Sequence, residues 1–264
     1  MNIKSKTILA LTLFATFTTA LFAASKKPFI VKKGGRKEYY DTITADSRGV
    51  LMLKKGKITK KIKPGAYNYA HILMPSDIKK SVGLLKSKKY SEAAAQFQKL
   101  YAKYKFLGWG AFCAYAGAQA LDAAGKKPAA ISSLTLVSKM PVDPSEQRYY
   151  FRGQKLLATL YVDTSNFDKA LRILQKLSKS NDNSTVAFSN NMIGDLFAKQ
   201  GKNKDAKLMY MRTALLFDQK NKKERPEALV KIIKMLKKEK NNKALEFEKI
   251  LKVDYPGSHY IQEI

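Results

Sequence analysis

The sequence predicts a mainly α fold, in which pairs of antiparallel helices stack as an α-solenoid behind a small β-meander module. Three observations carry this prediction. From Pro75 onward, apolar residues recur with a period near 3.6 residues, which is typical of amphipathic helices. Within that region, a short motif containing an alanine recurs every 36–40 residues. Residues 26–75 instead are rich in Tyr, Thr, Ile and turn-forming residues, which favour strands.

Composition argues against most enzyme classes. The chain has 264 residues, 50 of them Lys or Arg and 21 Asp or Glu, which gives a formal net charge of +29. One cysteine excludes an internal disulfide and a cysteine-based zinc finger. Two histidines argue against a multi-histidine metal site or a histidine-based triad. We therefore expect a protein that is not an enzyme, with no catalytic residue, metal or cofactor.

Residues 1–24 have the three parts of a signal peptide. Lys4 and Lys6 form a basic start, Thr7–Phe22 carries no charge, and the small residues Ala23 and Ala24 follow. We predict cleavage after one of these alanines and export, to the periplasm or outside the cell. The alternative is an uncleaved anchor in the inner membrane formed by residues 7–24.

Residues 26–75 are predicted to form a small β module. Strand-forming residues fill Glu38–Ala45, Val50–Leu53 and Lys57–Ile62, separated by turn signals at Asp46–Gly49 and Lys54–Gly56. We expect a meander of three or four strands, or a small open barrel. Because an isolated hairpin is marginal in water, the module is expected to pack on the helices that follow.

Residues 76–260 are predicted to form about five helix pairs. The repeated alanines are Ala93, Ala130, Ala170, Ala206 and Ala244. In three repeats a second small residue stands twelve positions earlier, as Ala118, Ala158 and Gly194. Small residues at this spacing indicate two helices that cross closely. Gly125, Ser165 and Gly201 lie between the predicted helices, where a turn former or a left-handed residue is needed.

These segments resemble tetratricopeptide repeats. The fourth repeat matches best, with the residues Ile193, Gly194, Phe197, Gly201, Ala206 and Tyr210 on the family's signature positions. The repeats exceed the family's usual length of about 34 residues, which implies extended loops. The C-terminal run Asp254–Tyr260 is also similar to repeat ends in bacterial envelope proteins. The resemblance implies an α-solenoid whose first helices line a concave groove for a protein or peptide partner.

The family's groove positions carry over to specific residues of this chain. They are Phe112, Tyr115 and Gln119 in the second repeat, Arg152, Lys155, Thr159 and Asp163 in the third, and Phe188, Asn191, Asp195 and Lys199 in the fourth. This mixture suits an extended peptide with an acidic or carboxylate feature. The lysine–asparagine pair with which some members clamp a peptide C-terminus is not reproduced, so we do not expect such a clamp.

Other chemically notable residues have simpler interpretations. His71 is expected to be structural or exposed and His259 to be solvated, because no second ligand accompanies either at metal-binding spacing. Cys113 lies on an apolar helix face and is expected to act as a small hydrophobic residue. Most aromatics among residues 109–151 are expected in the core.

Basic residues offer an alternative function. Six lysines fall within ten residues of the β module: Lys54, Lys55, Lys57, Lys60, Lys61 and Lys63. Such a cluster attracts polyanions. Nucleic acid is not expected as a partner, because lysine is far more frequent than arginine and the sequence has no known nucleic-acid recognition motif. An anionic envelope polymer or lipid surface fits better, and a merely solubilising role remains open.

The sequence therefore predicts an exported, non-enzymatic adapter that binds a protein or peptide partner of the cell envelope in the repeat groove. The alternative is an electrostatic binder of an anionic polymer or lipid surface through the lysine-rich module.

Overall fold

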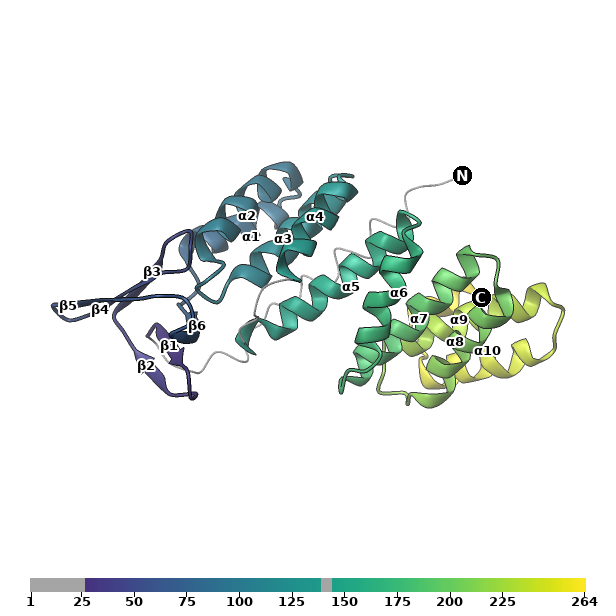
Figure 1. Cartoon of the computed structure of the whole chain (residues 1–264). Helices are drawn as coiled ribbons and strands as arrows, with labels where there is room; N and C mark the ends of the chain where they lie inside the picture. The colour runs from purple at the N-terminus through teal and green to yellow at the C-terminus, as the bar shows by residue number, and fades with distance from the viewer. Residues whose placement is uncertain (1–26, 139–143) are drawn as a thin grey trace. The chain divides into compact units, whose positions relative to one another are not determined.

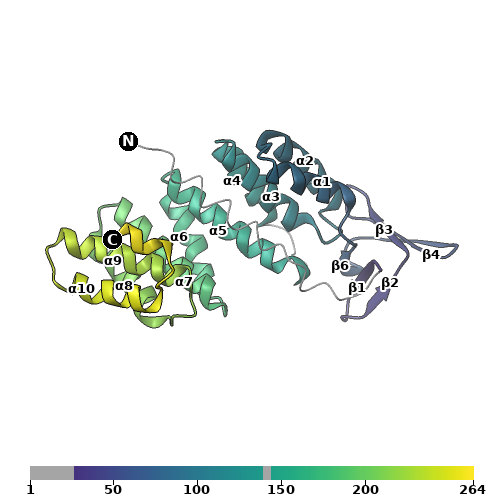
Figure 2. The ribbon, with the colours of Figure 1, turned by 180° about the vertical axis from the view of Figure 1, so that it is seen from behind.

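The computed structural model describes residues 27–138 and 144–264. The predicted signal peptide lies outside the described residues. The chain divides into two compact units, residues 1–154 and residues 155–264. Figures 1 and 2 show the β-strands and the helices α1 to α4 in the first unit.

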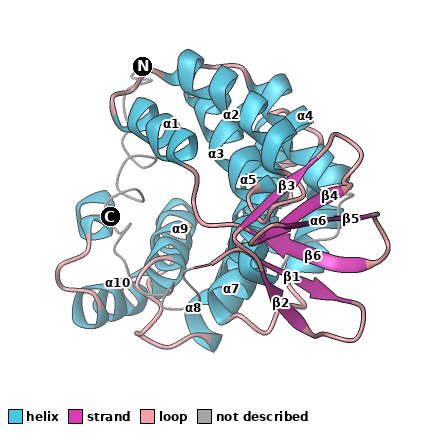
Figure 3. Cartoon of the chain, turned by 90° about the vertical axis from the view of Figure 1, so that its left-hand side faces the viewer, coloured by secondary structure: helices cyan, strands magenta, loops and turns pink. Residues whose placement is uncertain are grey.

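Six strands form the N-terminal module, coloured magenta in Figure 3. They are β1 (Phe29–Lys32), β2 (Lys37–Tyr39), β3 (Thr42–Ala45), β4 (Leu51–Lys55), β5 (Ile58–Ile62) and β6 (Tyr67–His71). Two antiparallel sheets of three strands result, in the orders β2-β1-β6 and β3-β4-β5. The β-meander preceding the helices is confirmed, with more strands than the sequence predicted.

The chain passes from one sheet to the other at Tyr40 and Asp41. The Tyr40 backbone N–H donates to the carbonyl of Pro28, beside β1, and the next N–H, of Asp41, donates to Lys54 on β4. The Asp41 carboxylate also accepts the N–H of Gly56 at 2.7 Å, which holds the β4–β5 turn. The predicted strand Glu38–Ala45 is therefore two strands in different sheets.

The module packs on the first helices, as expected. Ile30, Leu51 and Leu53 are fully buried and belong to the same apolar cluster as Phe97 and Trp109 of the helical region. The Trp109 indole N–H donates to the carbonyl of Ile72 at 2.9 Å, and so ties the end of β6 to the start of the third helix.

The described residues hold ten α-helices in five successive pairs. The pairs are α1 (Ser76–Lys86) with α2 (Tyr90–Tyr104), α3 (Gly110–Ala123) with α4 (Lys127–Val137), α5 (Gln147–Asp163) with α6 (Phe167–Leu177), α7 (Asn183–Lys199) with α8 (Asn203–Leu216), and α9 (Glu224–Lys238) with α10 (Lys243–Asp254). The described ranges also include the 3₁₀ helices η3 (Pro144–Glu146) and η4 (His259–Glu263).

Each repeated alanine lies in the first turns of the second helix of its pair and is buried. Ala118 and Ala158 on first helices are also fully buried. A methyl group on Gly194 would lie 2.5 Å from the Cε1 atom of Tyr210. Small residues therefore set the helix–helix distance, as the sequence predicted.

Each pair turns through a residue in the left-handed region. Gly125 and Gly201 have φ of 76°, and Ser165 has φ of 59°. In the first and fifth pairs, Lys88 and Lys240 adopt the same conformation, with φ of 59° and 54°. These two lysines stand near the corresponding turn position in their repeats, and nothing in their side-chain chemistry indicates such a turn.

The C-terminal residues close the second unit. Tyr255 and Tyr260 are buried in the cluster formed by α8, α9 and α10, and η4 packs on α9. The Arg225 guanidinium donates to Asp254 at 2.6 Å and to the Tyr255 hydroxyl at 3.2 Å. The tail therefore covers apolar surface of the last repeat, and His259 is exposed as expected.

Gly125, at the inter-helix turn of the second pair, is expected to contribute to stability. Gly125→Ala forces a Cβ into the left-handed region, and we expect the free energy of unfolding to fall by about 1–2 kcal/mol. Gly83→Ala is the matched control, because Gly83 lies inside α1 with open space around it. It is expected to stabilise the same unit by about 0.5–1 kcal/mol. Urea denaturation measures both; equal effects would contradict this role of Gly125.

The close approach at Gly194 gives a second prediction. Gly194→Ala places a methyl group against the Tyr210 ring, and we expect a loss of about 1–3 kcal/mol of stability from overpacking. Tyr210→Leu in the same chain removes the ring and should recover part of this loss, which a double-mutant cycle in urea measures. Additive losses would show that the two residues do not oppose each other.

Candidate partner-binding face

Five charged or aromatic residues assigned to the groove lie on α5 and α7 within the second unit. Lys155 and Asp163 belong to α5, and Phe188, Asp195 and Lys199 belong to α7. Positions spaced by three, four or seven to eight residues share one side of a helix. We call these five residues the α5–α7 face.

The structure brings Lys155 and Phe188 together. The Lys155 Nζ atom lies 5.2 Å from the centroid of the Phe188 ring, a cation–π arrangement. Asp182 caps α7 nearby by accepting the backbone N–H of Thr185 at 2.9 Å. Hydrogen bonding from the Thr185 side chain is the main cause that lowers the pKa of Asp182, and the charge of Lys155 contributes. A cation and an aromatic ring thus stand beside the start of α7.

The structure also brings Asp163 and Lys199 together. Their charged groups lie 3.6 Å apart, and both side chains are partly exposed. The Lys199 ammonium also donates to the carbonyl of Val162 at 3.2 Å. That carbonyl lies in the last turn of α5, where helix carbonyls lack partners and a positive charge is favourable. An ion pair this exposed contributes little to stability, so a ligand could exchange with it at low cost.

Asp195 belongs to a partly buried charge network that the sequence reasoning missed. Its carboxylate accepts the Tyr210 hydroxyl at 2.7 Å and lies 2.7 Å from the Lys231 ammonium. Lys231 also pairs with Glu227 at 2.6 Å, one turn earlier on α9. Burial by itself would lower the pKa of Lys231, but the charges of Glu227 and Asp195 raise it overall. The i, i+4 spacing of Glu227 and Lys231 is the sequence signal that could have indicated part of this network.

Two of the assigned groove residues are in the core instead. Phe112 is 2 % exposed, and its ring packs edge-on against Tyr149 at 4.8 Å. Asn191 is also 2 % exposed, and its amide donates to the Glu224 carbonyl at 2.8 Å. Neither side chain is open to a partner in this structure.

Thr159 of α5 is half-buried, and its hydroxyl donates to the Lys155 carbonyl of the same helix at 3.0 Å. The assigned residues Tyr115, Gln119 and Arg152 belong to the first unit. Tyr115 is half-buried, and burial raises the pKa of its hydroxyl against an opposing effect of the Arg152 charge. Arg152 is exposed. Gln119 is half-buried, and its Oε1 atom has no hydrogen-bond partner among the described residues. Tyr115 and Arg152 therefore offer accessible groups on the first unit.

His71 and Cys113, the two residues considered for catalysis or metal binding, are both buried among apolar and aromatic side chains. His71 is buried on β6, with its ring 5.5 Å from that of Phe29 and 5.8 Å from that of Trp109. Cys113 is fully buried, and burial raises the pKa of its thiol well above the usual value. Among the described residues, no group of three His, Cys, Asp or Glu side chains is placed to hold a metal ion.

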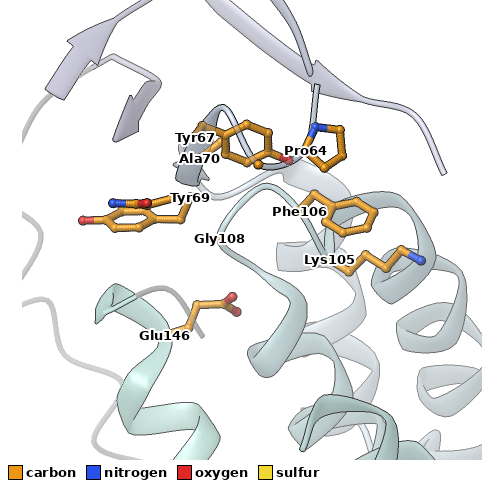
Figure 4. A pocket seen from close by; sticks show the side chains of 10 residues that line it. Pro64, Tyr67, Tyr69, Ala70, Lys105, Phe106, Gly108 and Glu146 are labelled. Atoms are coloured by element: carbon orange, nitrogen blue, oxygen red, sulfur yellow. The ribbon is translucent and has the colours of Figure 1, made fainter. Parts of the chain in front are cut away.

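The first unit contains a pocket of about 160 Å³ beside β6 (Figure 4). Tyr67 and Tyr69 of β6 line it, together with Phe106 from the α2–α3 loop and Glu146 from η3. The Glu146 carboxylate is buried and accepts the N–H of Phe112 at 3.2 Å, in the first turn of α3. Its charge is therefore used to cap that helix.

The six lysines of the β module lie on or next to the β4–β5 hairpin. All six side chains are exposed. They form a second candidate surface, which belongs to the first unit.

The comparisons with known proteins agree with this architecture. A family model described as a tetratricopeptide repeat-like domain matches residues 59–236. The chain therefore belongs to the tetratricopeptide repeat-like family, and the resemblance noted in the sequence is confirmed. No curated protein matches the chain.

Solved structures with a similar fold include two Rap proteins. A Rap protein complexed with Competence and Sporulation Factor matches with a TM-score of 0.52 and 15 % identity, over 71 % of this chain and 56 % of that protein. The apo form of RapI matches with a TM-score of 0.51 and 15 % identity, over 71 % and 55 % of the two chains. This chain thus spans just over half the length of each Rap protein. YrrB, a TPR protein with an unusual peptide-binding site, matches with a TM-score of 0.44 and 16 % identity, over 70 % and 88 %.

The charge network around Lys231 gives a prediction. Lys231→Met leaves the carboxylates of Asp195 and Glu227 without their shared cation, and we expect the chain to lose about 1–3 kcal/mol of stability at neutral pH. In the wild type, the pKa of Lys231 is higher in the folded state than in the unfolded state. The stability that its charge gives the folded chain is therefore complete below the unfolded pKa and is lost only in strong alkali.

Lys234→Met is the matched control for this prediction, because Lys234 pairs with Glu263 at 2.9 Å but both side chains are about half exposed. Its loss should stay below about 1 kcal/mol. Urea denaturation at neutral pH measures both variants. A stability loss for Lys231→Met that is no larger than the loss for Lys234→Met would contradict the network.

Proposed function

We propose that this protein is an exported, non-enzymatic adapter that holds an extended segment of a protein partner along the first helices of its repeats. Membership of the tetratricopeptide repeat-like family supports a protein-binding scaffold. In repeats of this kind, the first helices line the concave side of the stack and present their side chains to a ligand.

The observation that carries the proposal is the composition of the α5–α7 face. It presents a partly exposed aromatic ring, Phe188, next to a partly exposed cation, Lys155, and a solvent-exposed ion pair between Asp163 and Lys199. Aromatic and cationic groups at one place suit a segment with both an apolar and an acidic side chain. A partner carboxylate can replace Asp163 as the acceptor for Lys199 because the existing pair is solvent-exposed.

The Rap protein offers a parallel. A member of the same fold class is complexed with Competence and Sporulation Factor. Since that similarity reflects the fold alone, it supports a binding role for the repeats here and leaves the identity of the partner to experiment.

The prediction that the protein is exported rests on the signal-like pattern of residues 1–24. We place the mature chain in the periplasm or outside the cell, with retention at the inner membrane through residues 7–24 as the alternative. In the described part of the chain, no helix combines the length and apolar character needed to cross a bilayer. Because we place the mature chain outside the cytoplasm, the partner that we propose is a component of the cell envelope.

Affinity capture tests the proposal. The chain is immobilised and exposed to envelope extract at low and at high salt, and the retained proteins are identified by mass spectrometry. Lys155→Gln with Phe188→Ala should reduce retention of a defined protein at least tenfold, because both anchors of the α5–α7 face are removed.

Lys176→Gln with Leu208→Ala is the matched control, since both residues are exposed on second helices. It should leave capture unchanged, and circular dichroism confirms that both variants keep their helices. Equal retention by the two variants would reject the α5–α7 face as the binding site.

A further inference from the structure

The β4–β5 hairpin extends away from the helices α1 to α4 of its unit (Figures 1 and 3). Its base is anchored, because Leu51, Leu53 and Ile62 are buried in the core of the first unit. From Lys54 to Thr59 every residue is exposed, including Gly56 of the turn, whose φ is 59°. A well-anchored base with a fully exposed tip is a geometry suited to contact with another surface.

The strand register distributes the lysines over both faces of the hairpin. Lys60 stands opposite Leu53, and Lys61 stands opposite Met52. Since successive side chains point to opposite faces of a strand, Lys60 and Lys61 lie on different faces. The positive charge thus surrounds the hairpin rather than marking one side of it.

Five of these lysines have no ion-pair partner among the described residues. They are Lys54, Lys57, Lys60, Lys61 and Lys63. The neighbouring β1–β2 hairpin differs, because Glu38 pairs with Lys32 at 2.7 Å and with Arg36 at 3.8 Å. The carboxylate nearest the β4–β5 turn, Asp41, is engaged by the N–H of Gly56 and by Lys27. The tip therefore carries a concentrated positive charge that the fold does not neutralise.

An apolar residue stands at the tip of the hairpin. Ile58 is 73 % exposed and lies opposite Lys55 in the register. Burying this side chain in a contact would contribute about 1.5–3 kcal/mol, so Ile58 can add an apolar anchor to the lysines around it.

Protection of a sheet edge explains part of this pattern but not all of it. Strand β5 is at the edge of its sheet, and lysines on edge strands prevent pairing with other chains. That accounts for Lys60 and Lys61. It does not account for Lys54 on the central strand β4, for Lys57 in the turn, or for an exposed isoleucine, which works against such protection.

We propose that the β4–β5 hairpin binds an anionic lipid bilayer. The lysine ammonium groups lie against lipid phosphates, and the Ile58 side chain enters the interfacial region between them. Each lysine near an anionic surface contributes additively to such binding, and one short apolar anchor adds to it. Nucleic acid is less suitable, because residues 54–63 contain neither an arginine for base or phosphate forks nor an aromatic side chain for stacking.

Vesicle flotation with the full chain tests the proposal. Phosphatidylcholine vesicles with and without phosphatidylglycerol are compared. Binding to the neutral vesicles measures the contribution of apolar segments elsewhere in the chain, including residues 1–24. Lys54, Lys57, Lys60 and Lys61 are changed together to Gln. We expect binding to the anionic vesicles to fall by about tenfold or more, because four cations leave the contact.

The control changes Lys176, Lys179, Lys204 and Lys220 to Gln, which are exposed lysines of the helical repeats. It has the same net charge as the hairpin variant and should bind within about twofold of the wild type. Trp109 fluorescence confirms that the module stays packed on the helices, because the indole contacts Ile72.

A local readout at the tip completes the test. Ile58→Cys is labelled with an environment-sensitive fluorophore while Cys113 stays buried, and emission should rise and shift to the blue with anionic vesicles only. Ile58→Ser should lower the binding to anionic vesicles severalfold.

The proposal is overturned if the two lysine variants lose equal amounts of binding, or if the emission of the label does not change. It is also overturned if a single-stranded oligonucleotide binds through the same lysines and Ile58→Ser has no effect on vesicles.

Discussion

The distance between the two helices of a pair is the constraint on which the repeat architecture depends. Where the helices of the second, third and fourth pairs cross, both present a side chain no larger than a methyl group, since each additional carbon would push the backbones apart. The repeated alanines satisfy this condition on the second helices, and Ala118, Ala158 and Gly194 satisfy it on the first. The bulky residues around these positions then fill the remaining space, as Tyr210 does against Gly194.

The same constraint explains why so much of the helical region could be predicted from the sequence. Small residues at the helix crossings and turn formers between the helices are local requirements. They therefore recur at regular intervals that are visible in a single sequence. The left-handed conformation of Lys88 and Lys240 was not predicted, because a lysine side chain does not favour it and the stacked helices impose it. Tertiary packing outweighs the modest cost of a left-handed residue at these two turns.

The β module was harder to predict for a related reason. A strand's propensity indicates that residues are extended, but not which sheet they join. The change of sheet at Tyr40 and Asp41 depends on two consecutive hydrogen bonds to residues far apart in the chain. In the repeats, the assignment of groove positions could not foresee that Phe112 and Asn191 are covered by neighbouring elements. Exposure depends on what packs over a helix face, which lies outside the local pattern.

Charge is handled differently in the two candidate surfaces. In the second unit, Lys199 and Lys231 are each paired with carboxylates on neighbouring helices, so their charge is largely balanced within the fold. In the β4–β5 hairpin, the described structure supplies no such balance for most lysines. The first arrangement favours exchange with a partner of matched shape, and the second favours contact with any dense array of phosphates.

The buried cysteine has a consequence for following this protein's motions. Cys113 is the single thiol of the chain and is fully enclosed in the first unit, where its raised pKa keeps it protonated. An alkylating reagent can reach it only when that unit opens. The rate of alkylation therefore reports the opening of the first unit alone, and its slowing on addition of a ligand would reveal which half of the chain the ligand stabilises.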